Sequence, residues 1–320
     1  MPIYNKNQLN NESKELHVIR DTYEKVCRLK DILCYFASND LLNSSLALKG
    51  GTAINLLIYD LPRLSTDLDL DLCKNESKEE MAKDRERITE QVNSYMNQQG
   101  YVLSETSKMT HSLVSLEYSY VNSAGNKDRL KIEINYSLRV HVLPVERRSF
   151  IATQFISDTK ISMLSPIEIF AAKTVASLNR SAIRDLYDMN YLVQHPLFSK
   201  SEMEMYRKCV IFYLAIGTAI PMLDIDYGFI ESYKQHSVHT DLNPVMRNKD
   251  AFELNAAQRA VIDFINTNIF FTSEERQFLV EFKNGLYQPE LLFDEPEILK
   301  RIENHPMALW KTMKLKGMSI

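Results

Sequence analysis

Apolar residues near the start of the chain recur first at helical and then at strand spacing. Between residues 16 and 36 they return every three or four positions, which predicts an amphipathic helix with one buried face. A short apolar run at residues 46–48 then meets a pair of glycines, and a helical pattern resumes at Ile54. This order predicts a strand, a tight turn and a second helix.

The next patterns are typical of strands. Between residues 67 and 72 aspartates alternate with leucines, and this period of two predicts a strand with one acidic and one apolar face. A polar, surface-type helix is predicted over residues 79–99. Two further β-rich runs, at residues 112–121 and 129–137, are joined by a segment containing Gly and Asn, which suits a hairpin loop.

The character of the chain changes near residue 165. Ser165, Pro166 and Glu168 form the pattern of a capping box with proline at the first helical position, which predicts that a helix begins there. Helical periodicity then continues over residues 167–178, 183–192, 206–216 and 256–271. We therefore predict an α/β (α+β) fold, with a mixed-sheet domain and its N-terminal helix in residues 1–160 and a mostly helical domain in residues 161–320.

Composition and charge narrow the class of protein. The 320 residues are 45% hydrophobic and 25% charged with only 8 Gly and 10 Pro, which is ordinary globular composition and excludes collagen-like and disordered chains. The net charge is −4, so the molecule as a whole is no polycation that would coat nucleic acid. A local basic patch stays open as an alternative.

Several other classes are disfavoured by what the sequence lacks. The four cysteines form no CxxC pair, and the seven histidines show no zinc-binding spacing. The N-terminus has no apolar secretory segment, and the longest uncharged run, residues 209–223, is shorter than a membrane span requires. We expect a cytoplasmic protein that has no membrane partner.

The densest chemical signal is a glycine pair followed by two aspartates. Gly50 and Gly51 let the backbone approach a phosphate and open a helix whose free N–H groups favour an anion, and Thr52 adds a hydroxyl. Asp67 and Asp69 lie two apart on a strand, so both carboxylates leave one face about 6–7 Å apart at the Cα level. That spacing suits two Mg²⁺ ions in phosphoryl or nucleotidyl transfer. Each half of the motif taken alone would be a turn or a solvated strand edge.

A third carboxylate is expected on an adjacent strand. Glu133 alternates with Ile132 and Ile134, so its side chain leaves the face opposite the isoleucines, as a metal ligand would. The alternative is a solvated strand residue beside Lys131.

Lys173 stands out in the helical half. It sits among apolar residues, where a lysine usually has a specific anionic partner. On the next predicted helix, Asp185 and Asp188 lie three residues apart and share a face.

Three segments together resemble a known family. They are KGGTAINLLIYDLPRLSTDLDLDL at residues 49–72, SPIEIFAAK at residues 165–173 and NRSAIRDLYD at residues 179–188. The first resembles the leading motif of the polymerase-β-like nucleotidyltransferases, in the variant found in AbiEii-type toxins of type IV toxin–antitoxin and abortive-infection systems, related to the MenT toxins. The likeness covers roughly residues 45–195.

The resemblance implies a role for each matching residue. Nucleotide binding falls to Gly50, Gly51, Thr52, Ser65 and Lys173, the last of which would neutralise the triphosphate. Metal binding falls to Asp67 and Asp69, with Glu133 where a third acidic residue is expected. Asp185 would fill the last acidic motif, so the catalytic set would be Asp67, Asp69, Lys173 and Asp185. The helical domain would complete the active-site cleft.

The implied function is that of a metal-dependent toxin that transfers a nucleotide from an NTP, with two Mg²⁺ ions, to the 3′ end of tRNA. A cognate antitoxin encoded nearby is the expected partner. The alternatives are transfer to a small molecule such as an antibiotic, transfer to a protein hydroxyl, and a degenerate module that only binds NTP. Retention of Asp67, Asp69 and Lys173 argues against degeneracy.

If RNA is the acceptor, a basic surface is required on this acidic protein. The C-terminal end supplies one candidate, because five basic residues face only Glu303 there, namely Lys300, Arg301, Lys311, Lys314 and Lys316. Trp310 lies among them and could stack on a base or pack into the core.

Overall fold

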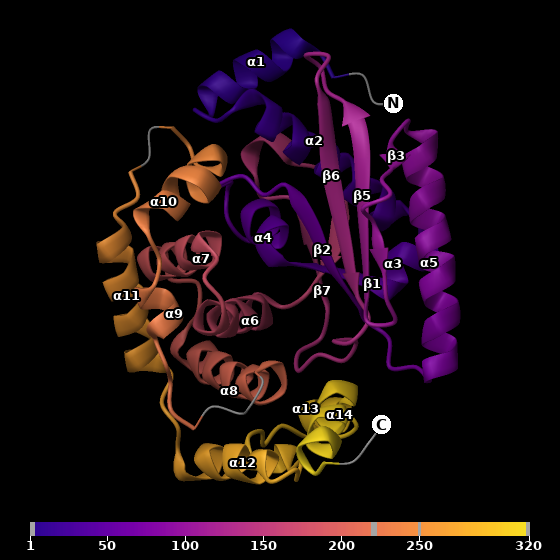
Figure 1. Ribbon diagram of the computed structural model, residues 1–320. Coiled ribbons are helices and arrows are strands. Elements are labelled where there is room, and N and C mark those ends of the chain that lie inside the picture. Colours follow the sequence, from indigo (N-terminus) through magenta and orange to yellow (C-terminus); the bar gives the residue numbers. More distant parts are fainter. Residues whose placement is uncertain (1–3, 219–222, 249–250, 318–320) are drawn as a thin grey trace. The chain divides into compact units, whose positions relative to one another are not determined.

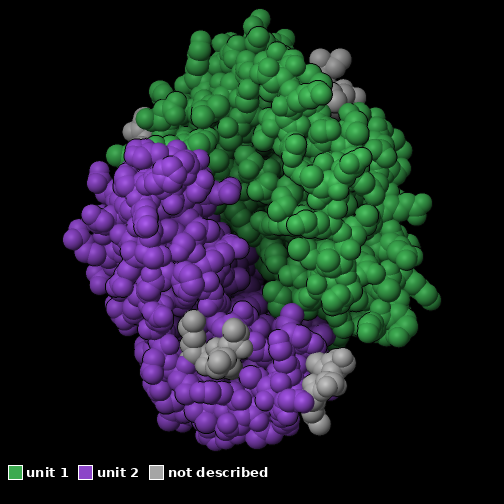
Figure 2. All heavy atoms as spheres, viewed as in Figure 1, with its two compact units in different colours: residues 1–139, 145–164, 243–251 green, residues 140–144, 165–242, 252–320 purple. Residues whose placement is uncertain are grey.

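The computed structural model describes residues 4–218, 223–248 and 251–317. The chain divides into two compact units (Figure 2). Unit 1 comprises residues 1–139, 145–164 and 243–251, and unit 2 comprises residues 140–144, 165–242 and 252–320. Both units are therefore discontinuous, whereas the sequence patterns predicted two continuous ranges.

Unit 1 is built on a mixed sheet, in which the described residues form eight strands. The strand order is β3-β5-β6-β2-β1-β8-β7, with β4 paired to β5. The central strand β2 runs antiparallel to β1 and parallel to β6. The strands are β1 (Leu46–Lys49), β2 (Asp67–Leu72), β3 (Val102–Leu103), β4 (Lys108–Met109), β5 (Leu113–Val121), β6 (Lys127–Asn135), β7 (Glu146–Ser149) and β8 (Lys160–Met163). The predicted strands after the glycine pair and in the hairpin are present.

The two faces of this sheet differ in polarity because successive side chains point to opposite sides. Leu68 and Leu70 of β2 lie beside Ile132 and Ile134 of β6, and all four are at most 3% exposed. The intervening residues carry the charges and form the opposite face. The alternation read from the sequence therefore places the acidic side chains together on one polar face.

The helices of unit 1 flank this sheet. They are α1 (Lys6–Glu15), α2 (Arg20–Ser38), α3 (Asp40–Ser45), α4 (Gly50–Ala53) and α5 (Lys78–Gln98), and the π-helical turn η1 (Ile54–Ile58) continues α4. The long helix α5 runs beside the strands near β3 (Figure 1). It begins at a capping box in which Glu80 accepts a hydrogen bond from the backbone N–H of Ser77 at 3.1 Å.

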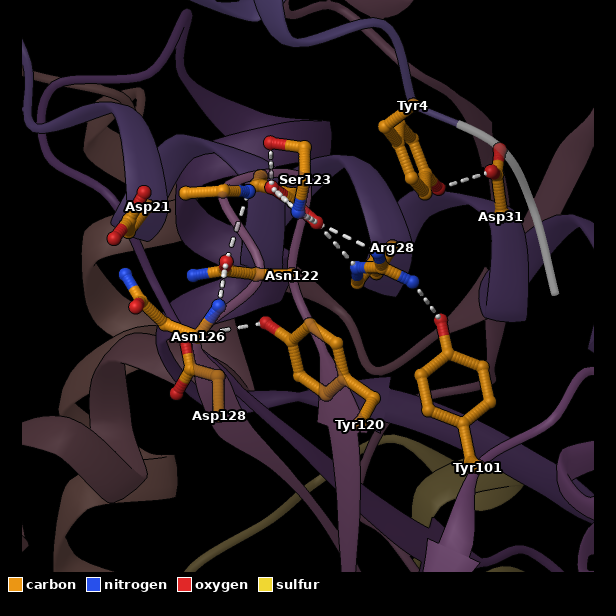
Figure 3. Close-up of polar contacts among 12 residues, drawn as sticks. Tyr4, Asp21, Arg28, Asp31, Tyr101, Tyr120, Asn122, Ser123, Asn126 and Asp128 are labelled. Carbon is orange, nitrogen blue, oxygen red and sulfur yellow. Dashed lines mark hydrogen bonds and ion pairs between the residues drawn. The ribbon is translucent and has the colours of Figure 1, made fainter.

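A buried ion pair joins α2 to the β5–β6 hairpin. Arg28 is 2% exposed and pairs with Glu24, which accepts from its Nε at 3.0 Å and its Nη2 at 2.6 Å. Arg28 also donates to the hydroxyl of Tyr101 at 3.1 Å and lies 4.3 Å from the ring centroid of Tyr120 (Figure 3). The backbone N–H of Ser123, in the hairpin loop, donates to both carboxylate oxygens of Glu24.

Unit 2 is helical, in agreement with the periodicity after residue 165. Its helices are α6 (Pro166–Asn179), α7 (Ile183–Gln194), α8 (Lys200–Gly217), α9 (Gly228–Glu231), α10 (Gln235–Ser237), α11 (Leu254–Asn268), α12 (Ser273–Lys283), α13 (Pro296–Ile302) and α14 (Pro306–Leu315). Helix α6 packs against both α7 and α8. None of the described helices combines the length and apolarity needed to cross a membrane.

The predicted capping box at the start of α6 is wrong, although the helix begins at the predicted residue. Ser165 makes no side-chain cap hydrogen bond, and the carboxylate of Glu168 is fully buried. Glu168 instead accepts from the backbone N–H groups of Val142 at 2.7 Å and Leu143 at 3.1 Å. The Glu168 carboxylate thus binds a backbone segment distant in sequence and not the start of its own helix. These hydrogen bonds connect residues 140–144 to unit 2.

Candidate functional site

The turn between β1 and α4 brings the glycine pair against the acidic strand. Gly50 has φ +68°, a left-handed conformation that favours glycine, and a Cβ built on it would lie 2.5 Å from Oδ2 of Asp69. A Cβ on Gly51 would lie 2.8 Å from Nη2 of Arg63 and 2.9 Å from Oγ of Ser65. Both positions must be glycine for the carboxylate and the following loop to come this close.

We expect Gly50→Ala to disable the site, whereas Gly125→Ala will not. Both glycines have positive φ, so each alanine adds roughly 1–2 kcal/mol of backbone strain. A Cβ at Gly125 would meet nothing within 4 Å, whereas one at Gly50 collides with Asp69. Denaturant unfolding should thus show a stability loss in both variants, the larger one in Gly50→Ala, and a nucleotidyl-transfer assay should show a loss of activity in Gly50→Ala alone. Equal activities in the two variants would contradict this assignment.

Thr52 and Asn55 fasten the turn to its surroundings. The Thr52 hydroxyl, which is almost fully buried, donates to the backbone carbonyl of Asp67 at 2.5 Å. The Asn55 side chain donates to the Gly51 carbonyl at 2.6 Å and accepts from the Arg63 backbone N–H at 3.1 Å. The Thr52 hydroxyl thus binds the backbone of the strand that carries the aspartates. The sequence had indicated a nucleotide-binding role for Thr52 and not this contact.

The predicted carboxylates meet on the polar face of the sheet. Asp67 and Asp69 project from β2, and Glu133 lies directly opposite Asp69 on the parallel strand β6. All three are half-buried. The carboxylate of Glu133 is engaged, because it pairs with the ammonium of Lys131 at 2.8 Å.

Lys131 is the site residue to which sequence reasoning gave no role. It lies opposite Asp67 in the β2–β6 register. Partial burial lowers the pKa of Lys131, but the surrounding carboxylates, with Glu133 foremost, together outweigh that effect and the pKa is raised. Asp67 and Asp69 add to the rise, so both act on this ammonium group. The sequence signal was the i, i+2 spacing to Glu133, which places the two side chains on one face.

A second lysine pairs with the third aspartate of β2. Lys49 contacts Oδ1 of Asp71 at 2.5 Å, and Asp71 is 1% exposed. Asp71 is therefore the buried partner of an ion pair.

The donor chemistry at Asp67 and Asp69 fits a divalent cation whose shell is completed from outside the chain. Two carboxylates on one strand face are ligands that Mg²⁺ prefers, and Mg²⁺ commonly takes its remaining oxygens from water and substrate phosphates. Across the described ranges, no three His, Cys, Asp or Glu side chains form a group that could hold a metal ion by themselves. Glu133 as a third ligand stays a prediction.

Lys173 and Asp185 meet in unit 2. The ammonium of Lys173 lies 2.8 Å from Oδ1 of Asp185 and 3.1 Å from Oδ2 of Asp188. Arg180 pairs with the other oxygen of Asp185 at 2.9 Å. Burial raises the pKa of Asp185, but the two cations outweigh it, so the pKa lies below its ordinary value. The anionic partner expected for Lys173 is this pair of aspartates.

The basic C-terminal end differs in part from the surface that its composition suggested. Trp310 is 42% exposed, and the ammonium of Lys314 lies 5.2 Å from its ring centroid. Lys311 is buried and donates to the Thr218 carbonyl. Burial lowers the pKa of Lys311, with a smaller effect from Lys314. Lys314, beside Trp310, and Lys316 are the exposed lysines at the end of α14.

Comparisons with known proteins identify a family and a shared fold. The family model described as nucleotidyl transferase AbiEii toxin, type IV TA system, matches residues 31–260. Among solved structures the chain is similar to MenT4, a nucleotidyltransferase toxin from Mycobacterium tuberculosis H37Rv, with 15% sequence identity and a TM-score of 0.58. That alignment covers 91% of this chain and 94% of MenT4, and at this identity it demonstrates a common fold. A search of curated proteins gives no match.

Proposed function

Because the chain belongs to the AbiEii family of type IV nucleotidyltransferase toxins, we propose that it transfers a nucleotide from an NTP to the 3′ end of a tRNA. The family fixes the coarser part of this statement: the chain is an NTP-dependent nucleotidyltransferase of a toxin–antitoxin system, with an antitoxin partner. Its fold is the α/β fold shared with MenT4, as predicted. The tRNA acceptor, a Mg²⁺ requirement, a role in abortive infection and action in the cytoplasm are parts of the proposal.

The observation that carries the proposal is the contact between Gly50 and the Asp69 carboxylate. It places the start of α4, whose backbone N–H groups have no side-chain cap, beside the acidic face of β2. N–H groups attract phosphate oxygens, and carboxylates attract the cation that accompanies a triphosphate. Unit 1 therefore offers adjacent places for both parts of a metal–NTP complex.

Each residue of this face has a distinct task. Gly50 and Gly51 allow a phosphate to approach the backbone, and Ser65 lines the turn next to Gly51. Asp67 and Asp69 would hold the divalent cation. That ion, when bound, would offset the charge that develops on the triphosphate during transfer.

We propose that Lys173 contributes to triphosphate binding and that Asp185 orients it. An ammonium group held by Asp185 and Asp188 has few rotamers left, so it is pre-organised for an anion. Lys173→Ala would also remove a cation from two buried carboxylates, of which Asp185 keeps Arg180, so its activity loss would include a stability effect. Lys173→Arg keeps the charge and is the better probe of the role in triphosphate binding.

The direct test is to incubate the purified protein with each labelled NTP, Mg²⁺ and total cellular RNA. We expect label on tRNA and none after periodate oxidation of its 3′ end, because oxidation removes the acceptor hydroxyls. Label on a protein or a small molecule would replace the tRNA proposal with one of the other acceptors. Binding of NTP without any transfer would show a degenerate module.

The exposed C-terminal cations give a second test of the RNA acceptor. We expect Lys314→Glu with Lys316→Glu to weaken transfer to RNA and to flatten its salt dependence, because phosphate contacts release counterions. Lys6→Glu with Lys14→Glu on α1 makes the same change of charge at two exposed lysines and should have little effect. Transfer rates measured over a series of salt concentrations distinguish the two double variants. Equal behaviour of the double variants would remove α14 from the RNA surface.

A further inference from the structure

The polar face of the sheet carries charges of both signs in a regular pattern. Strand β2 contributes Asp67, Asp69 and Asp71, and the neighbouring strands contribute Lys49, Lys131 and Glu133. These four carboxylates and two ammonium groups leave a net charge of −2. One divalent cation neutralises that charge, whereas two would reverse it before any nucleotide bound.

The two lysines are not equivalent. Lys49 lies opposite Asp69 in the β1–β2 register, but its ammonium pairs with the deeply buried Asp71, one step beyond the candidate cation ligands. Lys131 stands opposite Asp67 on the adjacent strand, where side chains of neighbouring strands are about 5 Å apart at their bases. The ammonium of Lys49 is therefore engaged by Asp71, whereas Lys131 lies beside Asp67 and has its ion-pair partner on its own strand.

Glu133 holds Lys131 in this place. Its carboxylate contacts the Lys131 ammonium at 2.8 Å, and the two residues share the polar face of β6. The same carboxylate lies opposite Asp69, where a second metal ion would need it as a ligand. In the part of the chain that the structure describes, no three His, Cys, Asp or Glu side chains lie close enough together to hold a metal ion. The ligand that a second ion requires is thus already neutralised by a lysine.

We propose that the ammonium of Lys131, held by Glu133 beside Asp67 and Asp69, takes the place of a second divalent cation, so that each chain binds one. This inference rests on the proposed function, because it assumes the cation site at Asp67 and Asp69. Lys131 then supplies a fixed positive charge to the triphosphate, as a point charge that needs no metal. Glu133 is a positioning residue for that lysine and not a metal ligand.

The test counts Mn²⁺ ions bound to the full-length chain. Equilibrium dialysis with Mn²⁺ and a non-hydrolysable NTP analogue, read by electron paramagnetic resonance, gives the number per chain. We expect one ion in the wild type and two in Lys131→Met, in which the Glu133 carboxylate is released. Arg129→Met is the matched control, because Arg129 lies on the same face of β6 but pairs with Glu117, and it should bind one ion.

The outcomes separate the inference from the proposed function. Two ions in the wild type, or one in Lys131→Met, would overturn the role of Lys131 and leave the enzyme assignment intact. No bound ion in the wild type would remove the cation site at Asp67 and Asp69 and the inference with it. Lys131→Gln repeats the measurement with a shorter polar side chain, and thermal unfolding of each variant verifies that the fold is retained.

Discussion

Asp69→Asn is expected to lower the rate of nucleotidyl transfer by roughly a thousandfold, equivalent to about 4 kcal/mol of lost transition-state stabilisation. The substitution keeps the shape of the side chain and removes the charge with which Asp69 would bind a cation. Asp67→Asn is expected to act in the same way, because both aspartates lie on the same face of β2. Single-turnover rates with a labelled NTP measure the effect, and growth inhibition in cells should disappear in parallel.

Glu117→Gln serves as the control for this experiment. Glu117 lies on β5, opposite Lys131 and on the same polar face, but its carboxylate pairs with the exposed Arg129 at 3.1 Å. Removal of the Glu117 charge should leave the rate of nucleotidyl transfer close to that of the wild type. If Asp69→Asn retains near-normal activity, the role of this face in transfer is wrong. If Glu117→Gln is equally inactive, the effect comes from the charge of the whole face and not from cation ligands.

Glu24→Ala is expected to destabilise unit 1 by about 3–5 kcal/mol, because it leaves the charge of Arg28 buried without an anionic partner. Glu24 and Arg28 have side-chain exposures of 0% and 2%, so water cannot replace the missing carboxylate without opening the core. The substitution also removes the acceptor for the Ser123 backbone N–H, and with it one of the contacts between α2 and the hairpin. Denaturant unfolding of the purified protein measures the loss.

The adjacent residue on α2 provides a matched comparison. Lys25 pairs with Asp128 of the same hairpin at 2.7 Å, but both side chains are more than a fifth exposed. Lys25→Ala should therefore cost less than about 1 kcal/mol, as partly solvated pairs usually do. Similar losses in Lys25→Ala and Glu24→Ala would show that burial does not determine the strength of this anchor. Replacing Glu24 and Arg28 together by methionine should recover much of the stability.

The local elements were largely readable from the sequence because their signals are local. The alternation over β2 and β6 required only a period of two, and the helices after residue 165 required only a period near 3.6. The start of α6 was placed correctly by Pro166, yet the partner of Glu168 was not, because a carboxylate three residues into a helix can accept equally well from a distant backbone N–H. Local patterns indicate where a helix begins. They do not indicate which hydrogen-bond donor from a distant segment will bind its side chains.

The sequence by itself determined the family and the residue types at the site. The glycine pair, the alternating aspartates of β2 and the segments around Lys173 and Asp185 are short-range patterns, and the match over residues 31–260 confirms the family that they indicated. Only the tertiary structure decided which charges pair. The β2–β6 register sets Glu133 opposite Asp69 and Lys131 opposite Asp67, and packing buries Lys311 while it exposes Trp310. Strand register and burial depend on contacts between segments far apart in the chain, and no local pattern specifies those contacts.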